Sequence, residues 1–174
     1  MGRKHAALAY RTADRLRQLL VAPPAFAPVI GFVGLLFGCQ EAPLYEKVYG
    51  FENNEWTQRV KPEFKVEIAD TTSEYDFVLT LRTTTDYKFN NLWVFLNTKT
   101  PSGTKAREPF EIRITNPDGT WAGKKTGTVV EFPLTFRRRK LPEKGTYWFT
   151  LEQGITASTI DEVLDLGFRV DQVK

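Results

Sequence analysis

The sequence predicts an all-β fold: an antiparallel β-sandwich of seven to eight strands, Ig-like or jelly-roll-like, over residues 51–174. Apolar residues recur at every second position in most of seven separate runs, as in strands with one buried face. Reverse-turn sequences at 100–103, 116–119 and 142–145 separate several of these runs. The runs are 64–68, 75–81, 91–96, 110–114, 129–136, 147–151 and 164–170. Regular spacing without intervening helices is typical of a sandwich.

Three elements carry additional signals. Both faces of 91–96 (NLWVFL) are apolar, which predicts a central strand covered on both sides. Pro133 lies within 129–136 and predicts a sheet edge or a bulge there, because proline cannot donate a ladder hydrogen bond. Thr159 and Glu162 have the spacing of a capping box, which predicts one helical turn before the last strand.

The first 39 residues differ in composition from the rest. They hold five basic residues and one acid, Asp14, and an apolar run extends over 19–38. A basic start, an apolar middle and a small final residue are the order of a bacterial export signal. Without this leader, 19 of the 24 basic and 20 of the 21 acidic residues remain. The basic pI therefore belongs to the leader, and nucleic-acid binding is not expected.

The only cysteine, Cys39, follows Leu36, Phe37 and Gly38. An apolar and small-residue box before a cysteine is what lipoprotein signal peptidase cuts, after the sulfur has accepted a diacylglycerol thioether. We therefore predict a signal peptide over 1–38, a lipidated cysteine and tether over 39–50, and no cofactor besides the acyl lipid. Acyl chains contribute ~0.8 kcal/mol per buried methylene to membrane binding.

Two other interpretations of the leader remain open. In the first, 19–38 is a retained transmembrane helix, which has a suitable length. The prolines Pro23, Pro24 and Pro28 disfavour a regular helix there. In the second, ordinary signal peptidase cuts after 25–27 (AFA), although Pro28 directly follows this site. Both predict a chain without the lipid anchor.

The residue inventory disfavours an enzyme. The only histidine, His5, belongs to the leader, so the predicted sandwich has no imidazole for Ser-His-Asp or Cys-His catalysis or for histidine-ligated metal. No glycine-rich phosphate loop is present. No acidic pair is distinguished by its spacing, as a glycosidase would require. We predict a non-enzymatic protein without a metal site.

Three features are candidates for an interaction surface. Trp56 in a polar setting is either an exposed aromatic platform or, as we prefer, a cover for the open end of the sandwich. Trp121, between small residues, is either exposed or packed against a hairpin. The basic run is either a solvated strand end that protects an edge, or a contact for anionic headgroups or an acidic partner. This run consists of Arg137, Arg138, Arg139 and Lys140.

The chain resembles the gliding-motility lipoprotein GldH family of the Bacteroidota over residues 51–170. The resemblance rests on 87–93 (YKFNNLW), 116–123 (NPDGTWAG), 145–153 (GTYWFTLEQ) and 163–170 (VLDLGFRV), together with the cysteine after the signal. These are packing and turn motifs without catalytic residues. They identify a family and attach no reaction to it.

The resemblance implies a cell-envelope lipoprotein required for gliding that works alongside type IX secretion components. Glu41 is the only acid directly after Cys39, so we expect the periplasmic face of the outer membrane. We expect a non-enzymatic assembly or stabilising partner whose contacts are the membrane and other gliding or type IX secretion proteins. A lipid-anchored carbohydrate-binding module is the alternative, because fold alone does not separate the two.

Overall fold

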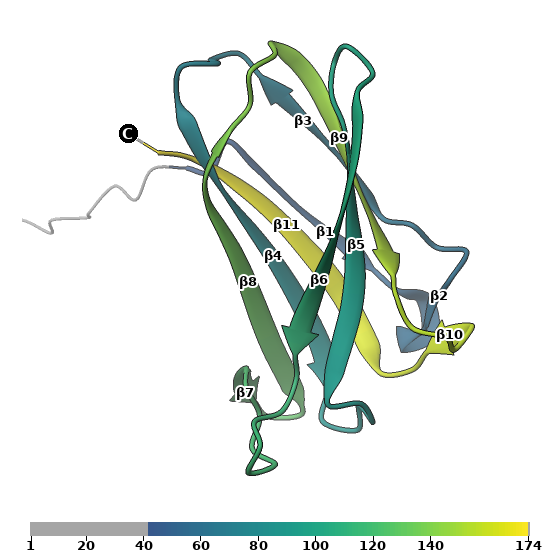
Figure 1. The fold of residues 1–174 in the computed structure, drawn as a ribbon. Coiled ribbons are helices and arrows are strands. Elements are labelled where there is room, and N and C mark those ends of the chain that lie inside the picture. The colour runs from purple at the N-terminus through teal and green to yellow at the C-terminus, as the bar shows by residue number, and fades with distance from the viewer. Residues whose placement is uncertain (1–41, 174) are drawn as a thin grey trace, which may run out of the picture. The chain divides into compact units, whose positions relative to one another are not determined.

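The computed structural model describes residues 42–173, which form two antiparallel sheets packed face to face (Figure 1). The five-stranded sheet has the order β1-β11-β4-β8-β7, the four-stranded sheet has the order β3-β9-β5-β6, and β10 and β2 form a small separate pair. The predicted all-β sandwich is confirmed. The strands are β1 (Tyr45–Gly50), β2 (Trp56–Thr57), β3 (Glu63–Ile68), β4 (Glu74–Thr84), β5 (Asn91–Lys99), β6 (Lys105–Arg113), β7 (Lys124–Thr126), β8 (Val129–Lys140), β9 (Gly145–Gln153), β10 (Thr159–Ile160) and β11 (Val163–Val173).

All seven predicted runs form strands, and two of the predicted turns have the expected hydrogen bonds. The Gly103 N–H donates to the Thr100 carbonyl at 2.9 Å, and the Gly119 N–H donates to the Asn116 carbonyl at 2.9 Å. Gly119 has a φ of 81°, which L-residues with a side chain rarely adopt. The turn sequences therefore set where β5 and the segment after β6 reverse direction.

The sheet extends beyond the predicted domain at its start. Residues 45–50, expected to be part of the tether, form β1 and pair along their whole length with β11. Only Tyr45 in β1 is partly buried, so its sequence lacks the alternation that marks the other strands. Residues 45–50 form a strand because they pair with β11, and the sequence alternation could not predict it. The short β7 was missed for the same reason, because all three of its residues are exposed.

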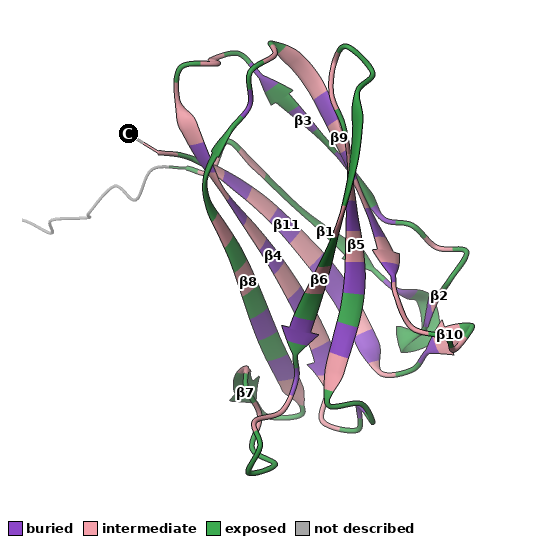
Figure 2. Ribbon diagram, viewed as in Figure 1, coloured by how far each residue is buried: buried purple, intermediate pink, exposed green. Residues whose placement is uncertain are grey.

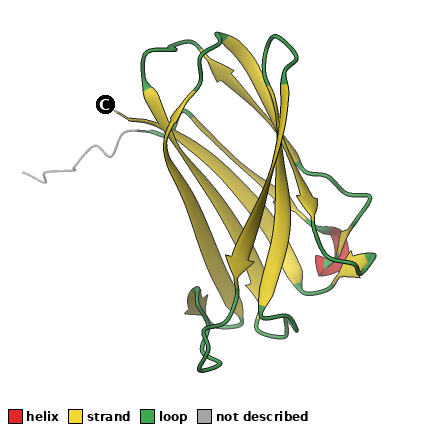
Figure 3. Ribbon diagram, viewed as in Figure 1, coloured by secondary structure: helices red, strands yellow, loops and turns green. Residues whose placement is uncertain are grey.

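Two local predictions were wrong. The capping-box segment forms the strand β10, and Glu162 has a φ of 67° that ends it (Figure 3). Ile160 is fully buried and pairs with Trp56, so tertiary packing overrides the local helix signal. In the residues that the structure describes, the one helical element is the 3₁₀ turn η1 (Glu52–Asn54). Strand β5 is central, but its outer face is open, because Trp93 is 43% exposed.

Pro133 occupies the edge position that the sequence predicted. It pairs with Thr80 of β4, while β7 reaches only residues 129–131 of β8. Beyond that point β8 is the outer strand of its sheet. Proline there removes an amide that would otherwise face outward without a partner.

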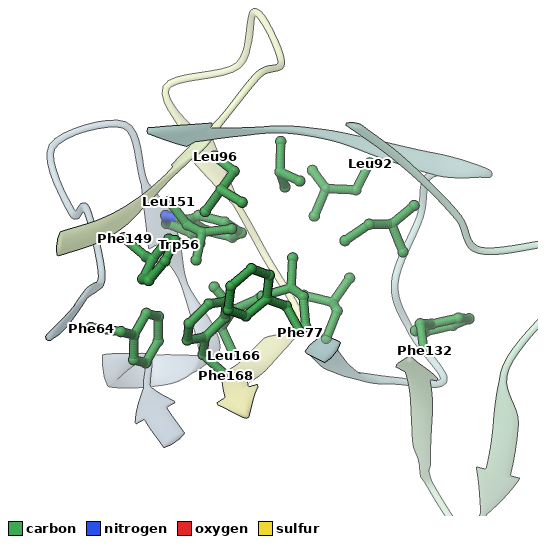
Figure 4. Close-up of a cluster of buried hydrophobic side chains, with 14 of the residues drawn as sticks. Trp56, Phe64, Phe77, Leu92, Leu96, Phe132, Phe149, Leu151, Leu166 and Phe168 are labelled. Atoms are coloured by element: carbon green, nitrogen blue, oxygen red, sulfur yellow. The ribbon is translucent and has the colours of Figure 1, made fainter. Parts of the chain in front are cut away.

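The core lies between the sheets and is built from alternate residues of both (Figure 2). Phe168 of β11 is at its centre (Figure 4). Its ring centroid lies 5.2 Å from that of Phe64, 5.1 Å from that of Phe149 and 5.9 Å from that of Phe77. Such aromatic pairs contribute about 0.5–1.5 kcal/mol each beyond the area they bury. This cluster joins β3 and β9 to β4 and β11.

Candidate functional site

The predicted anchor lies outside the described residues. Cys39 and the preceding box of Leu36, Phe37 and Gly38 belong to the part of the chain before residue 42. Lipidation of Cys39 therefore stays a prediction. Among residues 42–173, no helix is both long and apolar enough to cross a bilayer.

Trp56 is not an interaction surface. Its side chain is fully buried, and its ring stacks on Phe51 at a centroid distance of 4.9 Å. The indole N–H donates to the Val60 carbonyl at 2.9 Å, which satisfies the one polar group that burial would otherwise leave unpaired. The exposed-platform interpretation is wrong: Trp56 lies in β2 of the small β10-β2 sheet, and its side chain belongs to the hydrophobic core.

Trp121 is half-buried. Its ring centroid lies 6.5 Å from that of Phe132 on β8, and its backbone forms an isolated bridge with Thr115. The Asn116 side chain donates to the Trp121 carbonyl at 3.4 Å. Packing against the turn and β8 therefore buries part of the Trp121 side chain, as the packed interpretation predicted.

The basic run at the end of β8 is exposed, and two of its four side chains have acidic partners. Arg139 donates to both carboxylate oxygens of Glu108 at 3.2 Å, and Arg138 lies 3.6 Å from Glu74. Arg138 also has a φ of 55°, at a bulge where its backbone N–H donates to Asp76 at 2.8 Å. Arg137 and Lys140 are exposed in the same strand. The run does not converge on a pocket lined by all four residues.

A candidate site that the sequence did not reveal lies on the outer face of the four-stranded sheet. Three aromatic residues point outward there: Trp93 and Phe95 from β5, and Trp148 from β9. A cavity of about 540 Å³ opens on the same face. We call it the basic pocket; the side chains of Lys99, Lys105, Arg107, Asn97, Trp148 and Thr150 line it together with two carboxylates, Glu63 and Glu152.

Cations lie over two of the aromatic rings. The guanidinium of Arg107 is 3.5 Å from the Phe95 ring centroid, and the ammonium of Lys99 is 4.8 Å from the Trp148 ring centroid. Gly154 makes room for this arrangement, because a Cβ there would lie 2.9 Å from the Phe95 ring. The alternation of 93, 95, 97 and 99 on one face was visible in the sequence. It was read as a covered face because Trp93 and Phe95 are apolar.

Glu152 is the less exposed of the two carboxylates of the pocket. It accepts a hydrogen bond from Lys61 at 2.9 Å and one from Arg107 at 3.4 Å. The bond from Lys61, followed by the contribution of Arg107, holds the pKa of Glu152 below its usual value. Glu63, 3.5 Å from Lys65, is more exposed. The pocket therefore presents cations, carboxylates and an indole side by side.

The outer face of the five-stranded sheet is arranged differently. Arg82 donates through Nε to Asp165 at 2.8 Å and through its terminal nitrogen to the second oxygen, a bidentate pair. The hydrogen bond that Arg82 donates to Asp165 raises the pKa of Arg82. Arg169 pairs with Asp171 at 2.8 Å. Within residues 42–173, no group of three or more His, Cys, Asp or Glu side chains gathers to hold a metal ion.

The described residues define a two-sheet antiparallel sandwich. One outer face presents cations over aromatic rings, and the other holds the Arg82–Asp165 and Arg169–Asp171 pairs. The family model described as GldH lipoprotein matches residues 43–170. The chain belongs to the GldH lipoprotein family, as the resemblance indicated.

Two named relatives align over most of the chain. The chain is 28% identical to the gliding motility lipoprotein GldH of Flavobacterium johnsoniae over 79% of this chain and 90% of that protein. It is 26% identical to the GldH homolog of Christiangramia forsetii over 81% of this chain and 91% of that protein. Among solved structures, the active domain of a bacteriophage CBA120 tailspike protein has a TM-score of 0.31 at 8% identity. That match covers 74% of this chain and 18% of the tailspike chain. This likeness is too small to support any conclusion.

Proposed function

We propose that this chain is a gliding-motility lipoprotein: a non-enzymatic sandwich anchored to the membrane through acylated Cys39, which assembles or stabilises the gliding and type IX secretion machinery. The family match over residues 43–170 is the observation that carries the proposal. The 28% identical relative named for gliding motility supports it, because the alignment covers 90% of that relative.

The short tether supports an anchoring role. Residues 40–44 separate Cys39 from Tyr45, where β1 begins. Six steps along an extended chain span at most roughly 20 Å, so acylation of Cys39 would hold the sandwich within that distance of the membrane surface. Partners confined to the same membrane would then meet the sandwich at a raised effective concentration.

We place the protein on the periplasmic face of the outer membrane, with other gliding or type IX secretion proteins as its partners. Protease treatment of intact cells tests the orientation: the protein is expected to survive, and its digestion would place it on the cell surface. Co-purification from detergent-solubilised envelopes tests the partners. Recovery of gliding or type IX components is expected, and their absence would contradict the assembly role.

Complementation of a deletion strain tests the function. Deletion is expected to abolish colony spreading, and the wild-type gene is expected to restore it. The Cys39→Ser variant is expected to accumulate without palmitate label and to restore little spreading. A deletion strain that still spreads would contradict the gliding role. Full rescue by an unlabelled Cys39→Ser protein would contradict the anchor.

One of the two tryptophans that the carbohydrate-binding alternative requires, Trp56, is not accessible to a ligand. Trp56 is fully buried, and Trp121 is half-buried near Phe132. A saccharide site at these residues is therefore not proposed.

A further inference from the structure

Two lysines face each other in the basic pocket without an acid between them. Lys99 of β5 and Lys105 of β6 are directly opposed in the strand register. Like charges in this position destabilise a pair of strands. Among the ion pairs of the described residues, none involves Lys99 or Lys105. The sheet therefore concentrates positive charge at this point, and an external anion would offset the repulsion.

Packing holds two of the three cations of the pocket in place. Lys99 lies over Trp148, and Arg107 lies over Phe95. Contacts between cations and aromatic rings are attractive even at exposed sites. Arg107 is additionally held by Glu152 at 3.4 Å. Less side-chain entropy is lost on binding when the binding groups are already positioned.

The remaining lining suits a ligand rich in hydroxyl groups. Asn97 donates to the Thr150 carbonyl at 3.4 Å, which turns the amide of Asn97 toward β9. The carboxylates of Glu63 and Glu152 accept hydrogen bonds from hydroxyl donors. The volume of about 540 Å³ lies within the range of small-molecule sites, roughly 300–1,000 Å³.

We propose that the basic pocket binds an acidic saccharide, a sugar that carries a carboxylate on its ring. The carboxylate lies between Lys99 and Lys105, and the ring contacts Trp148 and Thr150. The carboxylates of Glu63 and Glu152 favour a saccharide over an acidic peptide, because they accept hydrogen bonds from hydroxyl groups that an acidic peptide lacks. They match a ligand that has one acid and several hydroxyl donors per unit. This site is additional to the proposed gliding role and does not rest on it.

Isothermal titration calorimetry of the full chain in detergent tests the site. The probes are trigalacturonate, the neutral trisaccharide maltotriose and the acidic peptide triglutamate. We expect trigalacturonate to bind and the other two to bind at least ~10-fold more weakly, because each lacks one of the two matched features. The affinity for trigalacturonate should fall as sodium chloride is added, because salt screens the exposed lysines.

Charge-removing variants locate the site. Lys99→Gln and Lys105→Gln are each expected to weaken trigalacturonate binding by about 10-fold, as expected for the loss of a charge-assisted hydrogen bond. Lys125→Gln makes the same change on exposed β7 of the other sheet and is expected to leave binding unchanged. Three results would each overturn the proposal: no heat with millimolar trigalacturonate, triglutamate binding as tightly, or unchanged affinity in both pocket variants. Far-UV circular dichroism confirms that each variant is folded.

Discussion

The outer faces of both sheets hold ion pairs, but the face of the four-stranded sheet also opposes two like charges. On the five-stranded sheet, Arg82 pairs with Asp165 and Arg169 pairs with Asp171. On the four-stranded sheet, Lys99 faces Lys105 across neighbouring strands. Charges paired inside the molecule contribute to its own stability, whereas an opposed like pair costs stability. The opposed lysines therefore mark the one part of the second face that the proposed ligand would stabilise.

The largest expected effect concerns the core that supports both faces. Phe168→Ala removes the ring that contacts Phe64, Phe77 and Phe149, and is expected to lower the free energy of unfolding by about 3–5 kcal/mol. Phe89→Ala, at a 44% exposed ring, is the control and should change it by less than about 0.5 kcal/mol. Urea denaturation measures both. Equal effects would mean that the two sheets do not share this core.

The second-largest expected loss of stability concerns the Arg82–Asp165 pair on the outer face of the five-stranded sheet. Asp165 is only 9% exposed, and Asp165→Ala leaves Arg82 without its bidentate partner. We expect a loss of about 1–3 kcal/mol in urea denaturation. Asp171→Ala breaks the more exposed pair and should cost less than about 1 kcal/mol. If the order of the two variants were reversed, the Arg82–Asp165 pair would not be the structural contact of this face.

Acidification probes Glu152, the less exposed carboxylate of the basic pocket. The folded pKa of Glu152 is lowered by Lys61 and Arg107. The stabilisation of the fold by ionised Glu152 is therefore fully present above the ordinary glutamate pKa of about 4.3. It is lost as the pH falls through the folded pKa. Glu152→Gln should cost about 0.5 kcal/mol at neutral pH, a value reduced by solvent screening. In urea titrations the difference from wild type should shrink toward pH 3; a constant difference would mean that the ion pair contributes nothing.

The last prediction concerns the opposed lysines and has an expected stability effect of similarly small size. Lys105→Glu replaces a like pair by an opposite pair and is expected to stabilise the sandwich by about 0.2–1 kcal/mol. The same change should abolish trigalacturonate binding, because the carboxylate then meets a negative charge. Lys125→Glu on β7 is the control for the change of net charge. A destabilised Lys105→Glu variant would show that Lys105 supports the fold and is not reserved for a ligand.

Sequence periodicity predicted the strands whose inner face is buried. It missed β1 and β7, because exposed strands carry no alternation and depend on pairing with β11 and β8. The aromatic face was misread because Trp93 and Phe95 suggest burial. The contacts of Arg107 with Phe95 and of Lys99 with Trp148 join residues from different strands. No local sequence pattern therefore indicates them. Trp56 shows the reverse: its polar neighbours suggested exposure, but it is fully buried.

Both faces act near a membrane only if Cys39 carries the lipid, so the anchor is the claim on which the proposed function depends. Mass spectrometry of the protein purified from its native envelope tests this directly. The account predicts a mature chain that begins at Cys39, with the mass of a diacylglycerol and an acyl group added to that residue. A chain that retains residues 1–38, or an N-terminal peptide with unmodified Cys39, would contradict it.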